Sequence, residues 1–278
     1  MVVLSGNSSK KVIEQIRYLN KLAKKHLKTR DVSRAIRSFE GAVRLVHRSR
    51  GRKARSRRLF EQGVYAHWKI GSCHAALGPE HHGKALGHLN VVRRYCNRRL
   101  KWIDEFDDVG TVFYGRALAA LARIYNLEKR HDRALACADE GLHVLYQNEG
   151  LQGCGAADLV EMLCFSARGD ALRGLSHCGE AVIRNYEQVL RHYQGHVSAE
   201  LDGADRRRLL RESGGWWPWT WDRLYPEATL TQTETAVREM APGLPPAMQV
   251  LAQSILQEIE CWREEKSATT GVRGLFDC

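Results

Sequence analysis

The chain has 278 residues, of which 44% are hydrophobic and 27% charged, and it carries a net charge of +11. This composition is typical of a globular protein with enough apolar residues for a core. Since no stretch of about 18 apolar residues occurs, a membrane-spanning helix is not expected.

The charge is concentrated at one end of the sequence. Residues 1–60 contain 18 Lys and Arg against 3 Asp and Glu, a balance of +15, whereas the remainder has a balance of −4. Such asymmetry predicts an acidic partner for the N-terminal part. The first residues lack a secretory pattern and the eight cysteines form no C-x2-C pair. We therefore expect reduced thiols and a cytoplasmic protein, with nuclear and mitochondrial locations left open.

The N-terminal third predicts two helical hairpins. After a flexible arm over residues 1–9, helices are expected over residues 10–28 and 31–47, with Asp31 as the N-cap of the second. A dense basic run follows at residues 48–58, either as a helical extension or as a solvated loop that orders on binding. The next two helices are expected over residues 60–77 and 82–100, and Gly78-Pro79 separates them.

Two further hairpins are expected in the middle of the chain. An acidic connector at residues 102–108 leads into the pair of short helices over residues 118–142, whose polar turn offers Asp132 as an N-cap. A glycine-rich loop at residues 148–155 precedes the last hairpin, with helices over residues 158–172 and 177–193.

The pattern changes after residue 195. Four of the seven tryptophans lie at residues 216–221, either as core that covers the end of the helical array or as an exposed binding patch. Thr231 and Glu234 form a predicted capping box for a helix that ends near Ala241. A last amphipathic helix over residues 247–264 suits a terminal cap. These features predict an array over residues 10–195, a capping region over 196–266 and a flexible tail over 267–278.

The four predicted hairpins share small residues at matching places. The alanines Ala35, Ala85, Ala134 and Ala181 recur at intervals of 50, 49 and 47 residues. In the segment over residues 118–142, Leu118, Ala122 and Tyr125 precede Ala134 and Ala138. Small side chains at such positions allow two helices to approach closely.

These residues resemble the tetratricopeptide repeat, with its small residue and Tyr in the first helix and its alanines in the second. The intervals exceed the usual 34 residues, so the chain is most similar to the extended repeats of kinesin light chains and of LGN-type spindle-orientation scaffolds. The resemblance covers residues 10–195. It implies an all-α fold, a right-handed superhelical solenoid of helical hairpins closed by a C-terminal capping helix.

The resemblance also implies a concave groove lined by the first helix of each hairpin. Its inward residues would be mostly basic with an aromatic shelf, which suits an acidic or extended peptide segment. The alternative is an ordinary charged face of a repeat protein. The predicted groove residues are Arg17, Asn20, Lys24, Lys28, Tyr65, Trp68, Ser72, Arg116, Arg123, Asn126, Ser166, Asp170 and Arg173.

The basic run is the second predicted contact surface. The planar guanidinium groups of its arginines can bind a phosphate or a carboxylate through two hydrogen bonds, so the run could attract an acidic protein. Alternatively, residues 44–58 could bind nucleic acid. No aromatic residue is interleaved with the run and no RNA-binding signature occurs, which favours the protein partner. A merely solvated linker remains an alternative. The residues of this patch are Arg48, Arg50, Arg52, Lys53, Arg55, Arg57 and Arg58.

No catalytic motif is recognisable. P-loop, nucleophile-elbow, HExxH and GxGxxG patterns are all missing from the sequence. Cys73 with His74, His81 and His82 does not match the spacing of a standard zinc site, so neither a metal nor a cofactor is expected. The expected function is therefore a non-enzymatic adaptor or scaffold subunit that binds protein partners. The alternatives are a basic factor associated with nucleic acid and, less favoured, a hydrolase region near residues 200–245.

Overall fold

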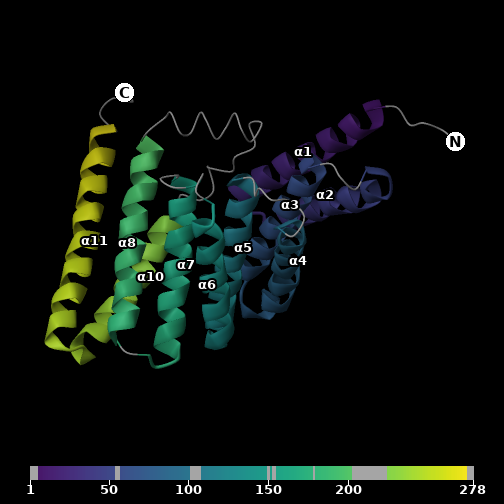
Figure 1. Cartoon of the computed structure of the whole chain (residues 1–278). Coiled ribbons are helices and arrows are strands. Elements are labelled where there is room, and N and C mark those ends of the chain that lie inside the picture. Colours follow the sequence, from purple (N-terminus) through teal and green to yellow (C-terminus); the bar gives the residue numbers. More distant parts are fainter. Residues whose placement is uncertain are drawn as a thin grey trace. The chain divides into compact units, whose positions relative to one another are not determined.

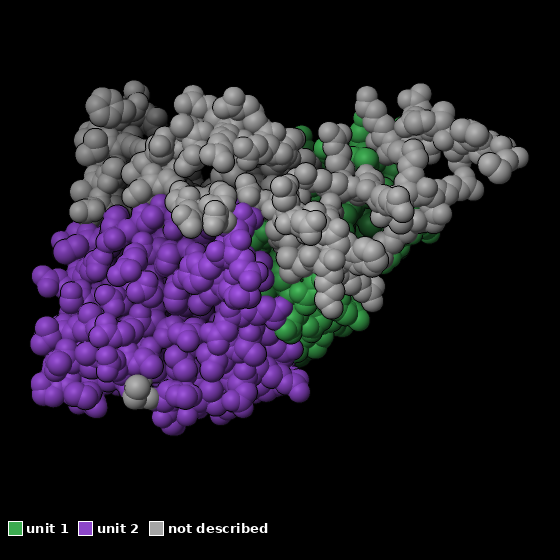
Figure 2. Space-filling model, in the orientation of Figure 1, with its two compact units in different colours: residues 1–124 green, residues 125–278 purple. Residues whose placement is uncertain are grey.

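The computed structural model shows an all-α protein and describes residues 6–53, 57–100, 108–148, 151, 155–177, 179–201 and 224–273 (Figure 1). Within these ranges lie ten α-helices, packed as sequential antiparallel pairs. The predicted helical hairpins are thereby confirmed, while the superhelix and its handedness stay predictions. The chain divides into two compact units, residues 1–124 and 125–278 (Figure 2).

The first unit is built from two complete hairpins and most of one further helix. α1 (Gly6–Lys28) packs against α2 (Val32–Lys53), and α3 (Arg57–Leu77) packs against α4 (His82–Leu100). α2 also packs against α3, which joins the two hairpins. A short 3-10 turn, Pro79–His81, follows Gly78 as the sequence predicted. α5 (Asp108–Leu127) begins in this unit and ends just beyond it.

The described residues of the second unit form five helices and the end of α5. α6 (His131–Tyr146) packs against α7 (Gly155–Gly174), which pairs with α8 (Gly179–Leu201). The last hairpin joins α10 (Leu224–Met240) to α11 (Pro246–Arg273), and both of its helices pack against α8. The final helix extends to Arg273, beyond the predicted end at residue 264.

Three of the turns between paired helices share one backbone design. Arg30, Lys129 and Ser176 each adopt a φ of 58°, the left-handed region that closes a helix C-terminus. In each turn the following N–H bonds back to the carbonyl five residues earlier, as in Arg130 to Tyr125 at 2.8 Å and His177 to Leu172 at 3.0 Å. This recurrence supports the hairpins as related units.

Glycines hold the paired helices close together in both units. A Cβ on Gly71 would lie 2.7 Å from Cγ of Leu89, and a Cβ on Gly169 would lie 2.7 Å from the ring of Tyr186. Both distances are shorter than any normal carbon contact. The predicted small residue in the first helix of a hairpin is therefore a packing requirement in α3 and in α7.

The register predicted for the fourth hairpin is wrong by one residue. Ala35, Ala85 and Ala134 are fully buried as expected, but Ala181 is partly exposed. Val182, Tyr186 and Val189 are fully buried instead. The larger apolar face of α8 packs inward because Gly169 leaves space for the Tyr186 ring.

Of the three predicted helix caps, one is confirmed. Asp31 accepts a hydrogen bond from the N–H of Arg34 at 2.9 Å, as an N-cap does. The prediction for Asp132 is wrong, because α6 begins at His131 and no side chain caps it. The capping box of Thr231 and Glu234 is wrong too, since both lie well inside α10.

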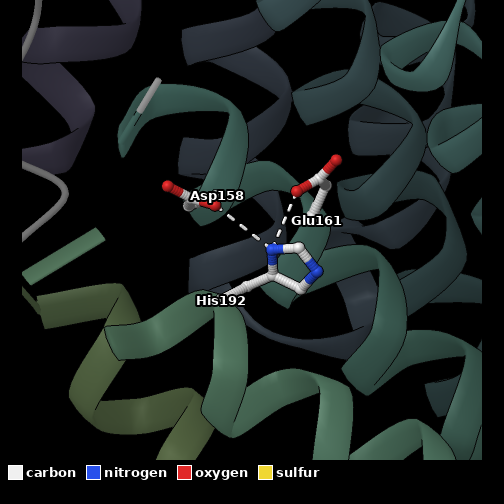
Figure 3. A group of neighbouring side chains, drawn as sticks. All are labelled: Asp158, Glu161 and His192. Atoms are coloured by element: carbon white, nitrogen blue, oxygen red, sulfur yellow. Dashed lines mark hydrogen bonds and ion pairs between the residues drawn. The ribbon is translucent and has the colours of Figure 1, made fainter. Parts of the chain in front are cut away.

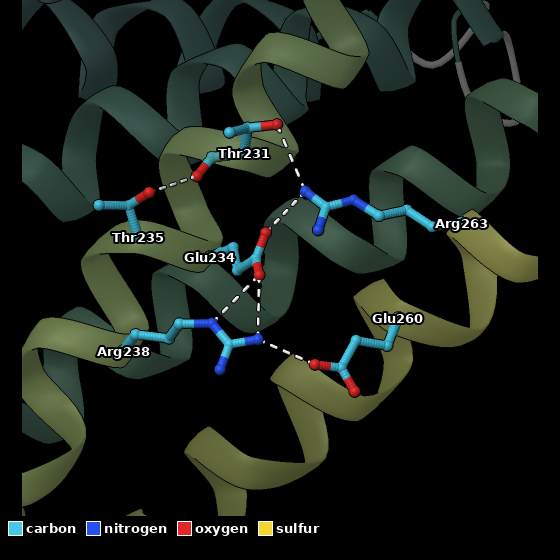
Figure 4. Close-up of polar contacts among 6 residues, drawn as sticks. All are labelled: Thr231, Glu234, Thr235, Arg238, Glu260 and Arg263. Atoms are coloured by element: carbon cyan, nitrogen blue, oxygen red, sulfur yellow. Dashed lines mark hydrogen bonds and ion pairs between the residues drawn. The ribbon is translucent and has the colours of Figure 1, made fainter.

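Glu234 instead ties the last hairpin together (Figure 4). It forms ion pairs with Arg238 at 3.0 Å and with Arg263 of α11 at 2.6 Å, and Arg238 reaches Glu260 at 2.8 Å. The hydrogen bond from Arg263 is the main reason why the pKa of Glu234 lies below its usual value. Val237 of α10 and Ile255 and Ile259 of α11 are buried.

Several predictions fall on parts of the chain that lie outside the described residues. They are the acidic connector up to residue 107 and the tryptophan cluster at residues 216–221.

Candidate functional site

The first helices of the N-terminal hairpins bring together most of the predicted groove residues of the first unit. Lys24 of α1 lies with its Nζ 5.3 Å from the centroid of the Tyr65 ring in α3. The guanidinium of Arg116 in α5 lies 5.4 Å from the Trp68 ring. Two helices, distant in sequence, thus place cations on neighbouring aromatic rings of a third helix, as cation–π attraction favours.

Lys69 completes this group, although the sequence analysis did not single it out. Its Nζ lies 4.0 Å from the Trp68 centroid and 6.0 Å from the Tyr65 centroid. The signal was present in the sequence, because Lys69 follows Trp68 directly and stands four residues after Tyr65 on the same helix face. We call Lys24, Tyr65, Trp68, Lys69 and Arg116 the cation–aromatic cluster.

The rings of the cluster are buried and do not form the open shelf that the sequence suggested. Tyr65 is fully buried and Trp68 is 5% exposed, and each makes ring contacts with Phe113 at about 6 Å. Lys69 and Arg116 are almost as buried, at 5% and 4%. Lys24 is half-buried and is the most exposed residue of the cluster.

Two buried polar atoms of α1, the helix that carries Lys24, have no hydrogen-bond partner among the described residues. They are Nε of Arg17 and Oδ1 of Asn20, both buried on α1. The Asn20 amide nitrogen donates to Oε1 of Gln62 at 3.1 Å, which fixes the orientation of the side chain. An unsatisfied buried polar atom costs about 1–3 kcal/mol, so this face of α1 is polar beyond the needs of packing.

The other predicted groove residues are placed in different surroundings. Lys28 and Arg123 are exposed. In the second unit, Asn126 donates to the carbonyl of Ala167 at 2.7 Å, and Arg173 pairs with Glu239 at 2.9 Å. In the first unit, the Ser72 hydroxyl donates to the carbonyl of Trp68, one turn earlier in α3. In the second unit, Ser166 is buried, and the Asp170 carboxylate accepts hydrogen bonds from Tyr186 and Gln232. Asn126, Arg173 and Asp170 therefore hold helices together.

The predicted basic patch spans the end of α2 and the start of α3. Arg48 is exposed in α2, whose backbone continues through Arg50 and Arg52 to Lys53, while Arg57 and Arg58 open α3. Arg55 lies outside the described residues. The backbone is thus helical from residue 48 to Lys53 and again from Arg57, while the predicted helical extension from Lys53 falls on residues 54–56, outside the described residues.

Four histidines of α3, the following 3-10 turn and α4 lie close together in the first unit. Nδ1 of His67 lies 3.0 Å from Nδ1 of His88, and the His74 ring lies near those of His88 and His81. Burial, joined by the neighbouring imidazoles, lowers the pKa of His74, and burial lowers the pKa of His88. Burial also raises the pKa of the Cys73 thiol to about 11, which disfavours the thiolate that a metal needs.

In the second unit, Asp158, Glu161 and His192 converge (Figure 3). Among the described residues, this is the one group of three such side chains whose ligand atoms could share an ion. The sequence analysis missed it, because 34 residues separate Asp158 from His192 and no motif spans them.

Comparison with known proteins adds no family assignment. No family model matches the chain, and no curated protein matches it either. Within the described ranges, every helix is too short or too polar to span a bilayer.

Proposed function

We propose that the protein is a non-enzymatic adaptor whose first unit binds an acidic, extended segment of a partner protein. The observation that carries this proposal is the convergence of Lys24, Lys69 and Arg116 on the rings of Tyr65 and Trp68 from three helices. Such a concentration of positive charge would attract the carboxylates of an acidic segment.

The polar face of α1 supports an extended peptide in particular. A peptide backbone offers one donor and one acceptor per residue, and Arg17 and Asn20 leave one donor and one acceptor without a described partner. The surplus of +15 in residues 1–60 would draw such a segment toward this unit over longer distances.

Nucleic acid is the competing ligand, through residues 44–58. The buried state of Tyr65 and Trp68 favours protein, because base stacking needs an open ring face. Binding of a phosphate backbone would depend on the basic patch alone, and its affinity would fall steeply as the salt concentration rises.

Two variants that each lose two positive charges distinguish binding at a specific site from general electrostatic attraction. In the first, Arg17→Gln and Lys24→Gln alter the inner face of α1. In the matched control, Lys25→Gln and Arg37→Gln remove two exposed charges from α1 and α2. The probes are a fluorescent peptide rich in Glu and Asp and a single-stranded RNA of similar charge, and their association and dissociation rates are measured.

We expect the inner-face variant to dissociate from the peptide at least tenfold faster, while the control mainly slows association, because contacts set the off-rate and outlying charges the on-rate. Equal behaviour of the two variants would refute the site. If only the RNA binds, and neutralising Arg48, Arg50, Arg52 and Lys53 abolishes its binding, the nucleic-acid function replaces the proposed one.

A further inference from the structure

Two carboxylates and one imidazole meet in the second unit, away from the cation–aromatic cluster. Asp158 and Glu161 stand one turn apart on α7, and His192 faces them from α8 (Figure 3). Nδ1 of His192 lies 3.2 Å from Oδ1 of Asp158 and 2.8 Å from Oε2 of Glu161. The three ligand atoms all lie within 4.8 Å of one another.

These separations are close to those within a metal coordination shell. Ligands held about 2.1 Å from one ion lie roughly 3.0–3.4 Å apart, depending on whether the geometry is octahedral or tetrahedral. We propose that Asp158, Glu161 and His192 form a binding site for a divalent transition-metal ion, bound through the two carboxylates and Nδ1. Facing helices are a common place for such a ligand set.

The side chains around the group hold its members in position. The Phe165 ring stacks on the His192 imidazole, with centroids 5.4 Å apart and planes 14° apart, which fixes the direction of Nδ1. Gly195 leaves room for the Asp158 carboxyl group, because a Cβ there would lie 2.8 Å from its Oδ2. A stacked ring and a glycine act here as the supporting shell that a metal site requires.

The local charge favours a cation. Within the described part of the chain, His192 is the one residue that pairs with either carboxylate. The nearby Arg168 is directed elsewhere, to Asp139 at 2.6 Å and Asn185 at 3.0 Å. A divalent ion would neutralise both carboxylates while the neutral imidazole serves as the third ligand.

The ligand types narrow the choice of ion. Imidazole suits zinc, copper, iron and nickel, whereas magnesium and calcium prefer oxygen ligands alone. The three side chains remain 12–17% exposed, so an ion can enter from solvent and keep water at its open positions. Zinc and cobalt are therefore the appropriate probes, with magnesium as the negative comparison.

The test uses the full chain after removal of metals with a chelator. Binding of Zn²⁺, Co²⁺ and Mg²⁺ is measured by titration calorimetry for the wild type, Glu161→Gln and Asp158→Asn. The matched control, Asp139→Asn, removes a carboxylate of the same unit that pairs with Arg168 instead. Co²⁺ absorption separates this site from cysteine ligation, because a thiolate ligand gives intense near-ultraviolet charge transfer that carboxylate and imidazole do not.

We expect the wild type and Asp139→Asn to bind one Zn²⁺ or Co²⁺ without a thiolate signal, and Mg²⁺ far more weakly. Glu161→Gln and Asp158→Asn should each lose at least about tenfold to a hundredfold in affinity. Circular dichroism confirms that each variant is folded. If both variants bind like the wild type, or if the wild type binds through thiolate only, the group is a structural ion pair and the proposal is overturned.

Discussion

The two units bury histidines in opposite electrostatic surroundings. In the first unit, His67, His74 and His88 have other imidazoles as neighbours, and the pKa values of His74 and His88 are lowered, mainly by burial. In the second unit, burial alone would lower the pKa of His192. The hydrogen bonds and charges of Asp158 and Glu161 outweigh it and raise that pKa to about 9.

The difference shows that the partner, more than the degree of burial, decides the charge of a buried histidine. With their Nδ1 atoms 3.0 Å apart, His67 and His88 share one hydrogen bond, so one imidazole donates while the other accepts. His192 instead serves as a cation between two anions. The first arrangement requires at least one neutral ring as the acceptor, whereas the second favours a positive charge on His192 in the metal-free protein.

Replacing one histidine in each unit should give the largest difference in the free energy of unfolding between the two units. His192→Leu leaves two close carboxylates without a cation and should destabilise the protein by about 3 kcal/mol. His88→Leu removes a neutral ring and one hydrogen bond and should cost only about 1 kcal/mol. Urea unfolding of both variants, in the presence of a chelator, measures the difference. Equal losses would mean that His192 is not charged in the folded protein.

The pH dependence of the two units should run in opposite directions. Because the pKa of His192 is raised to about 9, its contribution is complete below pH 6.5 and is lost as the pH rises through 9. This contribution is on the order of 2–3 kcal/mol. The lowered pKa values of His74 and His88 give a contribution that is present above pH 6.5 and is lost on acidification.

Hydrogen exchange resolves the two effects by segment. In metal-free protein, protection of α7 and α8 should fall between about pH 6.5 and 9, after correction for the intrinsic exchange rate. Protection of α3 and α4 should fall below about pH 6.5. A common pH profile for all four helices would show that these histidines do not control the stability of their own units.

The close helix contacts should also respond differently in the two units. At Gly71 an added methyl group meets Cγ of the buried Leu89, whose side chain has no hydrogen bond to hold it in place, and lies 3.3 Å from the carbonyl oxygen of Ala85. At Gly169 it meets the ring of Tyr186, whose hydroxyl is bonded to Asp170 at 2.7 Å. Gly169→Ala should therefore cost about 2 kcal/mol and Gly71→Ala about 1 kcal/mol or less, net of the better helix propensity of alanine. Thermal unfolding ranks the two variants, and the reverse order would contradict the fixed position of the Tyr186 ring.

The smallest effect on stability is expected at the left-handed turns between paired helices, a turn type that occurs in both units. Arg30, Lys129 and Ser176 have a φ of 58°, which disfavours a side chain. Replacing each with glycine should stabilise the protein by about 0.5 kcal/mol. Gly78, with a φ of 118°, is the control, and Gly78→Ala should destabilise. Melting temperatures that do not rise in any of the three variants would show that these turns are unstrained.

Local sequence signals predicted the hairpins well. The Asp31 cap and the boundaries of α4 follow from residues adjacent in the chain. The capping box at Thr231 failed for an equally physical reason. The same residue types can cap a helix or lie within one, and here the ion pairs of Glu234 with Arg238 and Arg263 suit the interior of α10.

Features that depend on distant residues were harder to predict. The resemblance to known repeats predicted an inward face that includes Lys24 and Arg116, but not that Tyr65 and Trp68 are buried against the Phe113 ring. Lys69 was overlooked because the repeat pattern assigns no inward role to its position. The group around His192 depends on the register between α7 and α8, in which the prediction was wrong by one residue.

The ion pairs of the last hairpin imply an unusual response to heat. The hydration of charged groups becomes less favourable as temperature rises, so the cost of pairing them falls. The network of Glu234, Arg238, Glu260 and Arg263 therefore gains relative strength on warming, while the burial of apolar residues such as Val237, Ile255 and Ile259 does not. On heating, α10 and α11 should remain paired with each other after helices joined only by apolar contacts have begun to separate.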